Sequence, residues 1–352
     1  MENRKYLIMG GSIIGIILVL LVSMMFLSSC TSKGNYSSAE KKLVSAAESY
    51  INDGKATLID GEKIIVTADT LATEGYMKTL DKLVKDDCSG SVTIMNNGGT
   101  FNYLPSLACT KYTTSTLKNK IINDNLTANG DGLYALDGEY VFRGKEPNNH
   151  LRFAGQDWYI IKINANGDLK LIAANASNQT TAWDNKFNED TDYSSGENVY
   201  AVSDLYQFLN DQYSAFKDTT KKHLIPYDVC IGTRERTNLV ISNQIDCAQT
   251  VKKQYVGLLN PSDYARASYD KDCIDILKGS CINFNYIYEN IAETWTTNAI
   301  ADSTYEAILY QAGRFAATPA RELHKYHLVV YISGNELYTS GTGTMDDPYI
   351  IK

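Results

Sequence analysis

The chain has 352 residues, of which 44% are hydrophobic and 21% are charged, and its formal net charge is −8. This composition is that of a globular protein and excludes an intrinsically disordered chain. The acidic balance argues against nucleic-acid binding, because contact with phosphates needs a basic face. The length after the first thirty residues suffices for two domains of ordinary size.

Residues 1–30 are predicted to be a membrane anchor. Arg4 and Lys5 precede an uncharged apolar run from Leu7 to Leu27, which as a helix rising about 1.5 Å per residue would span roughly 30 Å. A cleaved secretory signal has a shorter apolar region, of about 7–15 residues. Because the cations come before the apolar run, the N-terminus should stay inside and the rest of the chain should lie outside the cytoplasm. The expected location is the cell membrane, with most of the chain extracellular.

The end of this run has a second feature. Leu27-Ser28-Ser29-Cys30 resembles the lipobox of bacterial lipoproteins, in which the cysteine is lipidated and becomes the mature N-terminus. The apolar run is longer than in most such signals, so an uncleaved anchor helix stays open as the alternative to lipidation of Cys30. Both alternatives give the same topology.

Six further cysteines fall into close pairs, which outside the cytoplasm indicates disulfides. Fifteen pairings of six cysteines are possible, and local pairing is favoured, with free cysteines as the alternative. No pair has the C-x-x-C spacing of a thioredoxin-like or zinc site. The predicted pairs are Cys88 with Cys109, Cys230 with Cys247, and Cys273 with Cys281.

The segment 36–125 is predicted to form a small α+β domain. A capping box at Ser37–Glu40 should open a helix that ends at Gly54. Its apolar spacing should place one face in the core, with Leu43, Ala46, Ala47, Tyr50 and Ile51. A strand at Lys63–Thr67 and a short helix near Thr70–Glu74 should follow. Alternating residues around an Asn-Gly turn between Cys88 and Cys109 predict a disulfide-bracketed hairpin. A helix over 115–123 completes this domain, and the Asn- and Gly-rich segment 125–132 is the predicted boundary.

The segment 133–352 is predicted to form a larger, loop-rich α+β domain with mostly antiparallel strands. Residues 151–174 alternate around turn signals and indicate a meander. Ser203 should cap a helix that places Leu205 and Leu209 on one face. The runs 328–332 and 348–351 indicate the last strands.

Several segments of the exported part resemble a group of uncharacterised membrane-anchored surface proteins from AT-rich, Gram-positive-type gut bacteria. That resemblance implies an anchored exterior protein. The second domain is also distantly similar to C-type-lectin-like and sulfatase-modifying-factor-like domains, although the copper-binding cysteine pair of the sulfatase-modifying enzymes has no match, so their activity is not implied. The segments that carry the resemblance are 87–92, 103–105, 142–149, 153–158, 257–264, 295–296, 341–344 and 348–350.

Candidate site residues are few. Trp183 with Asp184, Tyr264 and Trp295 could form a platform on which a sugar stacks, although a place in the core is the simpler interpretation of each ring. The acidic loop that begins at Asp184 lacks the regular spacing of a calcium loop. His324 and His327 lack the glutamate of zinc hydrolases. No metal site and no cofactor are predicted.

The sequence therefore predicts a non-enzymatic, membrane-anchored surface protein that binds an extracellular ligand such as a glycan, a matrix component or an envelope component. No nucleophile motif of a hydrolase and no phosphate-binding glycine loop occurs in the sequence. Two alternatives stay open: a cell-envelope enzyme that uses carboxylates, and a structural partner of an envelope complex.

Overall fold

The computed structural model describes residues 35–351, apart from 98, 186–195 and 278. The described chain is a mixed α+β protein that divides into two compact units. Unit 1 comprises the described residues up to Leu58, Lys63–Met95 and Tyr103–Thr114, and unit 2 comprises Ile59–Glu62, Asn96–Asn102 and the chain from Ser115 onward.

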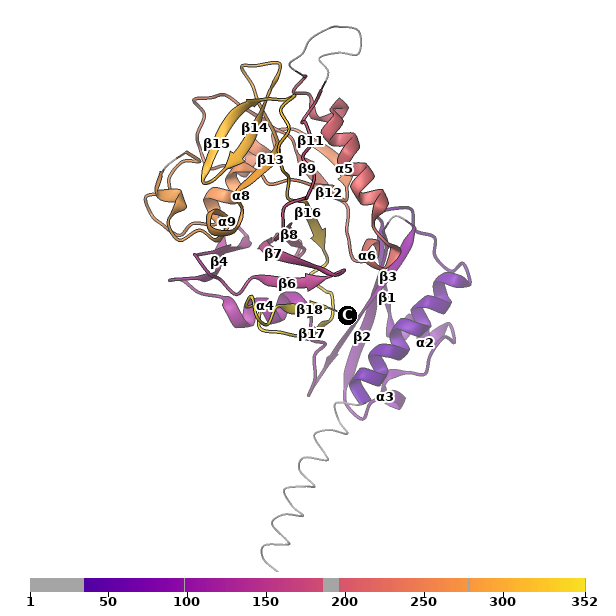
Figure 1. The fold of residues 1–352 in the computed structure, drawn as a ribbon. Helices are drawn as coiled ribbons and strands as arrows, with labels where there is room; N and C mark the ends of the chain where they lie inside the picture. Colours follow the sequence, from indigo (N-terminus) through magenta and orange to yellow (C-terminus); the bar gives the residue numbers. More distant parts are fainter. Residues whose placement is uncertain (1–34, 98, 186–195, 278, 352) are drawn as a thin grey trace, which may run out of the picture. The chain divides into compact units, whose positions relative to one another are not determined.

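Unit 1 is built on a three-stranded antiparallel sheet in the order β1-β2-β3, beside which the helix of residues 35–52 lies (Figure 1). That helix buries Leu43, Ala46 and Ala47, as its apolar spacing predicts, and Gly54 ends it with a φ of +71°. The hairpin predicted between Cys88 and Cys109 is confirmed. The elements of unit 1 are β1 (Lys63–Thr67), α2 (Ala68–Thr73), α3 (Leu80–Leu83), β2 (Cys88–Asn97) and β3 (Thr100–Cys109).

The predicted capping box at Ser37–Glu40 is wrong, because residues 35 and 36 are already helical. The side chain of Glu40 is buried and accepts hydrogen bonds from the Tyr112 hydroxyl at 2.8 Å and the Thr114 hydroxyl at 2.7 Å. It thus joins the helix to the segment after β3 within unit 1.

Unit 2 is organised around a nine-stranded sheet, whose main path runs β12-β16-β8-β7-β6-β18-β17, while β5 pairs with β7 and β4 with β5. The predicted meander is confirmed as β6, β7 and β8, and both predicted C-terminal strands are present. The strands are β4 (Gly132–Leu136), β5 (Glu139–Arg143), β6 (His150–Phe153), β7 (Gln156–Ile163), β8 (Leu169–Ala173), β12 (Val256–Gly257), β16 (Val329–Ile332), β17 (Tyr338–Ser340) and β18 (Tyr349–Ile351).

A second sheet of unit 2 has the order β10-β13-β14-β15, and a two-stranded sheet joins β9 to β11 (Figure 1). β13 is unusual because its polar residues Thr294, Thr296 and Asn298 are fully buried. These strands are β9 (Tyr227–Cys230), β10 (Thr233–Arg234), β11 (Thr250–Gln254), β13 (Glu293–Ile300), β14 (Glu306–Gln311) and β15 (Arg314–Pro319).

The helices of unit 2 are short apart from α4 and α5. Ser203 caps α5 by accepting a hydrogen bond from the Tyr206 amide at 3.1 Å, and Leu205 and Leu209 are buried as predicted. The helices are α4 (Leu117–Asn125), α5 (Asp204–Ala215), α6 (Asp218–Lys221), α7 (Asn243–Asp246), α8 (Pro261–Arg266) and α9 (Tyr286–Asn290).

The helix α4 belongs to unit 2, although the predicted domain boundary at 125–132 would place it in the first domain. The reason is its buried face: Leu117 and Ile121 are part of the large apolar core of unit 2. The first unit therefore ends earlier in the chain than the Asn- and Gly-rich segment indicates.

Candidate functional site

A cavity of about 490 Å³ and another of about 430 Å³ lie in unit 2, and the second has the features of a binding site. We call it the Asn149 pocket. It lies between the segment before β6, the helix α9 and the loop before β18. Its lining residues are Lys145, Glu146, Pro147, Asn148, Asn149, His150, Tyr159, Tyr286, Glu289, Asn290, Thr344, Met345 and Asp346.

The central feature of the pocket is the side-chain amide of Asn149, which is 0% exposed. Its Nδ2 donates a hydrogen bond to the carbonyl of Ile160 at 3.0 Å, whereas its Oδ1 has no hydrogen-bond partner among the described residues. Buried polar atoms are nearly always paired, and an unpaired one costs about 1–3 kcal/mol. Asn149 lines the pocket, but its Oδ1 is covered by protein atoms, so a ligand donor pairs with this oxygen only after a small movement of the pocket wall.

The hydroxyl of Tyr286 is the second polar group at this depth. The residue is 1% exposed; its hydroxyl donates a long hydrogen bond, of 3.4 Å, to the carbonyl of Ile160 and also interacts with the side-chain amide of Asn149. Burial raises the pKa of Tyr286 well above its usual value, while the neighbouring Asn149 amide opposes this rise. The hydroxyl therefore stays protonated and can both donate and accept.

His150 and Tyr159 form one wall of the pocket. They face each other across the β6–β7 ladder, with ring centroids 4.9 Å apart in an edge-to-face arrangement. Burial lowers the pKa of His150, and the charge of Asp157 opposes this shift. The imidazole is therefore neutral near neutral pH.

The segment before β6 is held in place by backbone contacts. The carboxylate of Asp131 accepts hydrogen bonds from the amides of Lys145 at 3.1 Å and Glu146 at 2.8 Å. The amide of His150 donates to the carbonyl of Gly343 at 2.9 Å. Gly343 has a φ of +82°, and a Cβ there would collide with the carbonyl of Asn148, so this close approach needs glycine. Asn149 is thus presented from a fixed backbone.

The helix α9 is fixed by Asn285, which is 0% exposed. Its Oδ1 accepts hydrogen bonds from the amides of Ile287 and Tyr288, and its Nδ2 donates to the carbonyls of Tyr264 and Cys281. Since the backbone of Asn285 also forms a bridge with Gly144, the cap positions Tyr286 beside the segment that carries Asn149.

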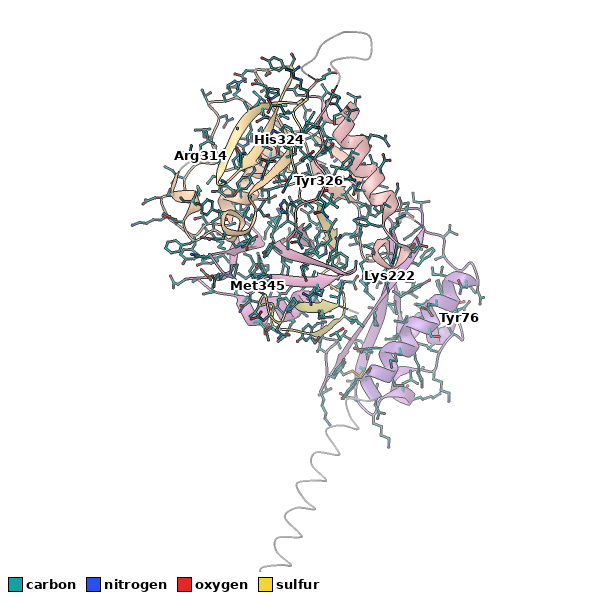
Figure 2. All side chains as sticks on the ribbon, in the orientation of Figure 1. Tyr76, Lys222, Arg314, His324, Tyr326 and Met345 are labelled. Atoms are coloured by element: carbon teal, nitrogen blue, oxygen red, sulfur yellow. A yellow bond between two sulfur atoms is a disulfide. The ribbon has the colours of Figure 1, made fainter. Side chains whose placement is uncertain are left out.

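The rim of the pocket is charged and exposed. Lys145 pairs with Glu289 at 3.5 Å, and Glu146 and Asp346 add two further carboxylates. The side chain of Met345, labelled in Figure 2, is the exposed apolar group of the rim. With one cation and three carboxylates, the rim favours a neutral or positively charged ligand over an anion.

Another cavity, of about 590 Å³, is larger but less suited to bind a ligand. It is lined by Gly155–Asp157, Ala173, Asn175–Asn178, Gln212, Tyr326 and Leu328. None of these described side chains has a buried polar atom without a partner. The Asn149 pocket differs in this respect.

The tryptophans that the sequence offered as a sugar platform lie in the core instead. Trp183 and Trp295 are 0% exposed, and their indole N–H groups donate to the carbonyls of Thr296 at 3.0 Å and Thr181 at 2.9 Å. Stacking on a sugar needs an open ring face, and these rings have none in the described structure.

Tyr264 and Asp184 are buried as well. The hydroxyl of Tyr264 donates to the carbonyl of Gly313 at 3.2 Å, and Oδ2 of Asp184 accepts from the amide of Glu197 at 2.9 Å. The two residues hold loops of unit 2 in place and do not line the Asn149 pocket. Most of the acidic loop after Asp184 lies outside the described residues.

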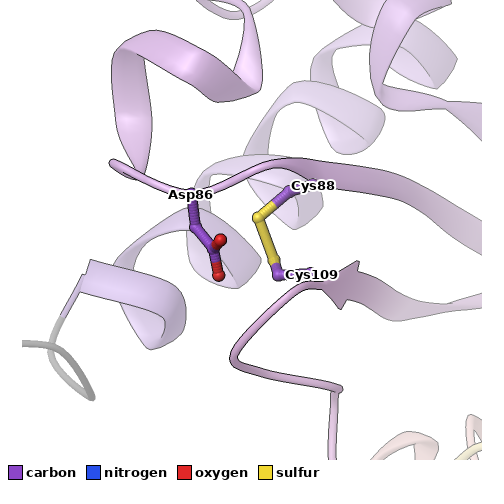
Figure 3. Close-up of side chains that lie close together, drawn as sticks. All are labelled: Asp86, Cys88 and Cys109. Carbon is purple, nitrogen blue, oxygen red and sulfur yellow. A yellow bond between two sulfur atoms is a disulfide. The ribbon is translucent and has the colours of Figure 1, made fainter.

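The three predicted disulfides are confirmed with local pairing, Cys88 with Cys109, Cys230 with Cys247, and Cys273 with Cys281. Asp86 lies beside the first of them (Figure 3), and these three residues are the group of potential metal ligands found in the described part of the chain. Because the two sulfurs are bonded to each other, they cannot serve as thiolate ligands. The group is a disulfide with a neighbouring carboxylate.

The predicted anchor over residues 1–30 and its Cys30 lie outside the described residues. In the part that is described, no helix has the length and apolar character needed to cross a membrane. Comparisons with protein-family models, with curated proteins and with solved structures yield no match. The resemblances noted in the sequence stay predictions.

The sequence alone does not single out Asn149 or Tyr286 as site residues. Pro147-Asn148-Asn149 reads as a loop, where asparagine is normally exposed. The one signal in the sequence is that segment 142–149, which contains Asn149, is among the segments that carry the resemblance to other surface proteins. Asn149 and Tyr286 are far apart in the chain, and only the folded structure brings them to one cavity.

Proposed function

We propose that this chain is a non-enzymatic, membrane-anchored extracellular surface protein that binds a glycan through the Asn149 pocket. The observation that carries the proposal is the buried Oδ1 of Asn149, which has no partner among the described residues and belongs to a residue that lines the cavity together with Tyr286. A fixed acceptor that is left unpaired, such as this oxygen, favours a ligand that pairs with it.

The disulfides support an extracellular location. Disulfides form and persist in oxidising surroundings and are rare in the cytosol. All six cysteines after Cys30 are paired, and all three bonds are local. The paired cysteines agree with the prediction that the chain is exported. That prediction comes from the charged and apolar residues of the N-terminus.

The chemistry of the pocket narrows the ligand class. Asn149 Oδ1 accepts only, so the ligand must carry an O–H or N–H donor. The Tyr286 hydroxyl can then accept or donate a second hydrogen bond. Together with the excess of carboxylates at the rim, this favours glycans with uncharged or amino sugars over sialylated or sulfated ones.

A glycan array probed with the fragment 36–352, which contains both units and all three disulfides, tests the proposal. We expect binding to neutral or amino-sugar glycans, and Tyr286→Phe should weaken that binding about tenfold through loss of one hydrogen bond. Tyr264→Phe is the matched control, because it removes an equally buried hydroxyl outside the pocket. Absence of binding, or equal loss in both variants, would overturn the proposal.

A second candidate function is glycan hydrolysis, which one observation favours. Glu146, Glu289 and Asp346 all line the pocket, and glycoside hydrolases use a pair of carboxylates across the scissile bond. Incubating the protein with an oligosaccharide that it binds on the array distinguishes binding from hydrolysis. Shortened products that disappear in Glu289→Gln would establish hydrolysis, whereas an intact oligosaccharide supports binding alone.

A further inference from the structure

The cavity of about 490 Å³ in unit 2 has a different character from the Asn149 pocket. We call it the lysine cavity, because two lysines of the nine-stranded sheet face it. It lies beside the sheet, the helices α7 and α8 and one disulfide. It is lined by Glu139, Lys162, Lys170, Cys230, Asn243, Gln244, Asp246, Cys247, Asn260, Asp263 and Tyr331.

Lys170 of β8 is 4% exposed, which is rare for a lysine. Its Nζ lies 2.6 Å from Oδ2 of Asp263 and 3.0 Å from Oδ1 of Asn260. Asn260 is 5% exposed and Asp263 is 4% exposed, so an amine, a carboxylate and a carboxamide meet in a site from which most water is excluded.

The amide of Asn260 is oriented by its own partners. Its Nδ2 donates to Oδ1 of Asn298 at 2.8 Å, and Thr297 Oγ1 and the Cys230 carbonyl lie 3.3 Å away. Asn298 is itself fixed, since its Nδ2 donates to the carbonyls of Gly232 and Asp246. The carbonyl of Asn260 therefore faces Lys170, and its carbon lies about 1.23 Å beyond the contacted oxygen.

Asp263 is placed to accept a proton. Burial by itself would raise the pKa of Asp263, but the positive charges of Lys170, Lys162 and Arg266 together hold this pKa below its usual value. The carboxylate is thus ionised and lies in contact with the ammonium group of Lys170. Transfer of one proton from Lys170 to Asp263 removes both charges, and it also removes the Lys170 charge that lowers the pKa of Asp263, so that burial then favours the protonated carboxyl group.

We propose that Lys170 and Asn260 become joined by an intramolecular isopeptide bond, with Asp263 as the general base. The geometry brings a desolvated amine to the carbonyl of a carboxamide, with a proton acceptor in contact with the amine.

The steps balance without any redox partner. The ammonium of Lys170 gives one proton to the Asp263 carboxylate, and the free electron pair on Nζ attacks Cγ of Asn260. The bond from Nζ to Cγ forms, a second Nζ proton passes to Nδ2, and the bond from Cγ to Nδ2 breaks. Ammonia leaves through the cavity, whose rim residue Gln244 is exposed, and Asp263 stays protonated beside the new amide.

The bond would link two distant segments of unit 2. Lys170 lies on β8 of the nine-stranded sheet, and Asn260 lies at the start of α8, 90 positions later in the chain. Such a link acts as the disulfides do, by restricting the unfolded chain. Unlike a disulfide, it would resist reduction.

Peptide mapping of the full-length chain by mass spectrometry tests this proposal, independently of the Asn149 pocket. Trypsin cannot cleave after an acylated lysine, so segment 163–186 should appear joined to segment 254–266. The mass of the joined peptide should be the sum of the two segments less one ammonia, about 17 Da. Recovery of the two segments unlinked from folded protein, with cleavage after Lys170, would overturn the proposal.

Variants show which residues the bond needs. Lys170→Arg keeps the charge next to Asp263 but offers no acylable amine, so the joined peptide should disappear, as it should in Asp263→Asn. Lys252→Met is the matched control: it removes a lysine that also pairs with an aspartate at 2.6 Å, but at the exposed surface, and the joined peptide should remain. A joined peptide in Lys170→Arg would contradict the assignment to Lys170, and one in Asp263→Asn would contradict the role of Asp263.

Discussion

The Asn149 pocket and the lysine cavity, both in unit 2, are similar in size but opposite in their hydrogen bonding. In the Asn149 pocket a buried amide oxygen has no partner among the described residues, and the hydrogen bond from the Tyr286 hydroxyl to the Ile160 carbonyl is long, at 3.4 Å. In the lysine cavity the buried groups satisfy one another through short ion pairs, Lys170 with Asp263 at 2.6 Å and Lys162 with Glu139 at 2.9 Å. The first arrangement favours a ligand, whereas the second holds the chain together.

The largest expected loss of stability comes from removing one partner of a buried ion pair at the lysine cavity. Asp246 pairs with Arg234 at 2.6 Å, and both residues are almost fully buried. Asp246→Ala leaves an uncompensated guanidinium in the core, and should lower the free energy of unfolding by about 3–5 kcal/mol. Denaturant unfolding monitored by tryptophan fluorescence measures this change.

The control for this prediction is Asp228→Ala. Asp228 pairs with Lys252 at the same distance, 2.6 Å, but both side chains are largely exposed. Such a pair contributes about 0–1 kcal/mol. Similar losses in the two variants would mean that burial of the pair does not decide its contribution.

The next effect concerns the disulfide that lines the lysine cavity. Cys230 and Cys247 are 17 positions apart, so replacing both by alanine should destabilise the protein by about 3 kcal/mol in the chain-entropy model. The same change at Cys273 and Cys281, 8 positions apart, should cost roughly 0.7 kcal/mol less. Thermal unfolding shows which double variant loses more stability. A larger loss for the variant without Cys273 and Cys281 would contradict the chain-entropy account.

A smaller effect distinguishes two fully buried asparagines. Asn149→Ala removes one hydrogen bond but also removes a buried oxygen that has no partner among the described residues, so the free energy of unfolding of the ligand-free protein should fall by less than about 1 kcal/mol. Asn285→Ala removes four hydrogen bonds and a helix cap, and should cost about 3 kcal/mol. Equal losses of unfolding free energy would show that Asn149 is as fully paired as Asn285.

The smallest predicted effect is a dependence of stability on pH near neutrality, to which His150 of the Asn149 pocket contributes. Burial lowers the pKa of His150, so the unfolded chain binds its proton more readily than the folded one. Stability should be complete above about pH 6.5 and fall as the pH falls through the lowered folded-state value. His327 contributes with the same sign, again through burial.

Melting temperatures at about pH 7.5 and pH 5.5 measure this dependence. His150→Gln should reduce part of the difference between the two melting temperatures, whereas Lys252→Met, which changes an exposed lysine, should leave it unchanged. An equal pH slope for the His150 variant and the unaltered chain would rule out His150 as a contributor.

Local patterns in the sequence predicted much of this fold. Alternation between Cys88 and Cys109 gave a hairpin and its disulfide, and the apolar spacing of the helix 35–52 gave its buried face. The strand β13 lacks such a pattern, because Thr294, Thr296 and Asn298 are polar and yet fully buried. Their partners, such as the carbonyl of Gly232, come from remote parts of the chain.

The site residues were harder to predict, for the same reason. An aromatic side chain such as Trp183 has the same sequence signature in a core as on a binding surface, and only the packing of unit 2 decides between them. For Asn149 the sequence pattern is misleading, because an asparagine among these neighbours indicates an exposed loop, whereas the structure buries it. Its burial results from contacts with α9 and with the loop at Gly343, which no local pattern encodes.

The central claim, that the Asn149 pocket binds a glycan, is tested most directly by a crystal structure of the fragment 36–352 with the best glycan from the array. The account predicts a sugar hydroxyl or amine within hydrogen-bond distance of Asn149 Oδ1, beside the Tyr286 hydroxyl. A glycan bound elsewhere on the protein, with the pocket unoccupied by it, would contradict the claim.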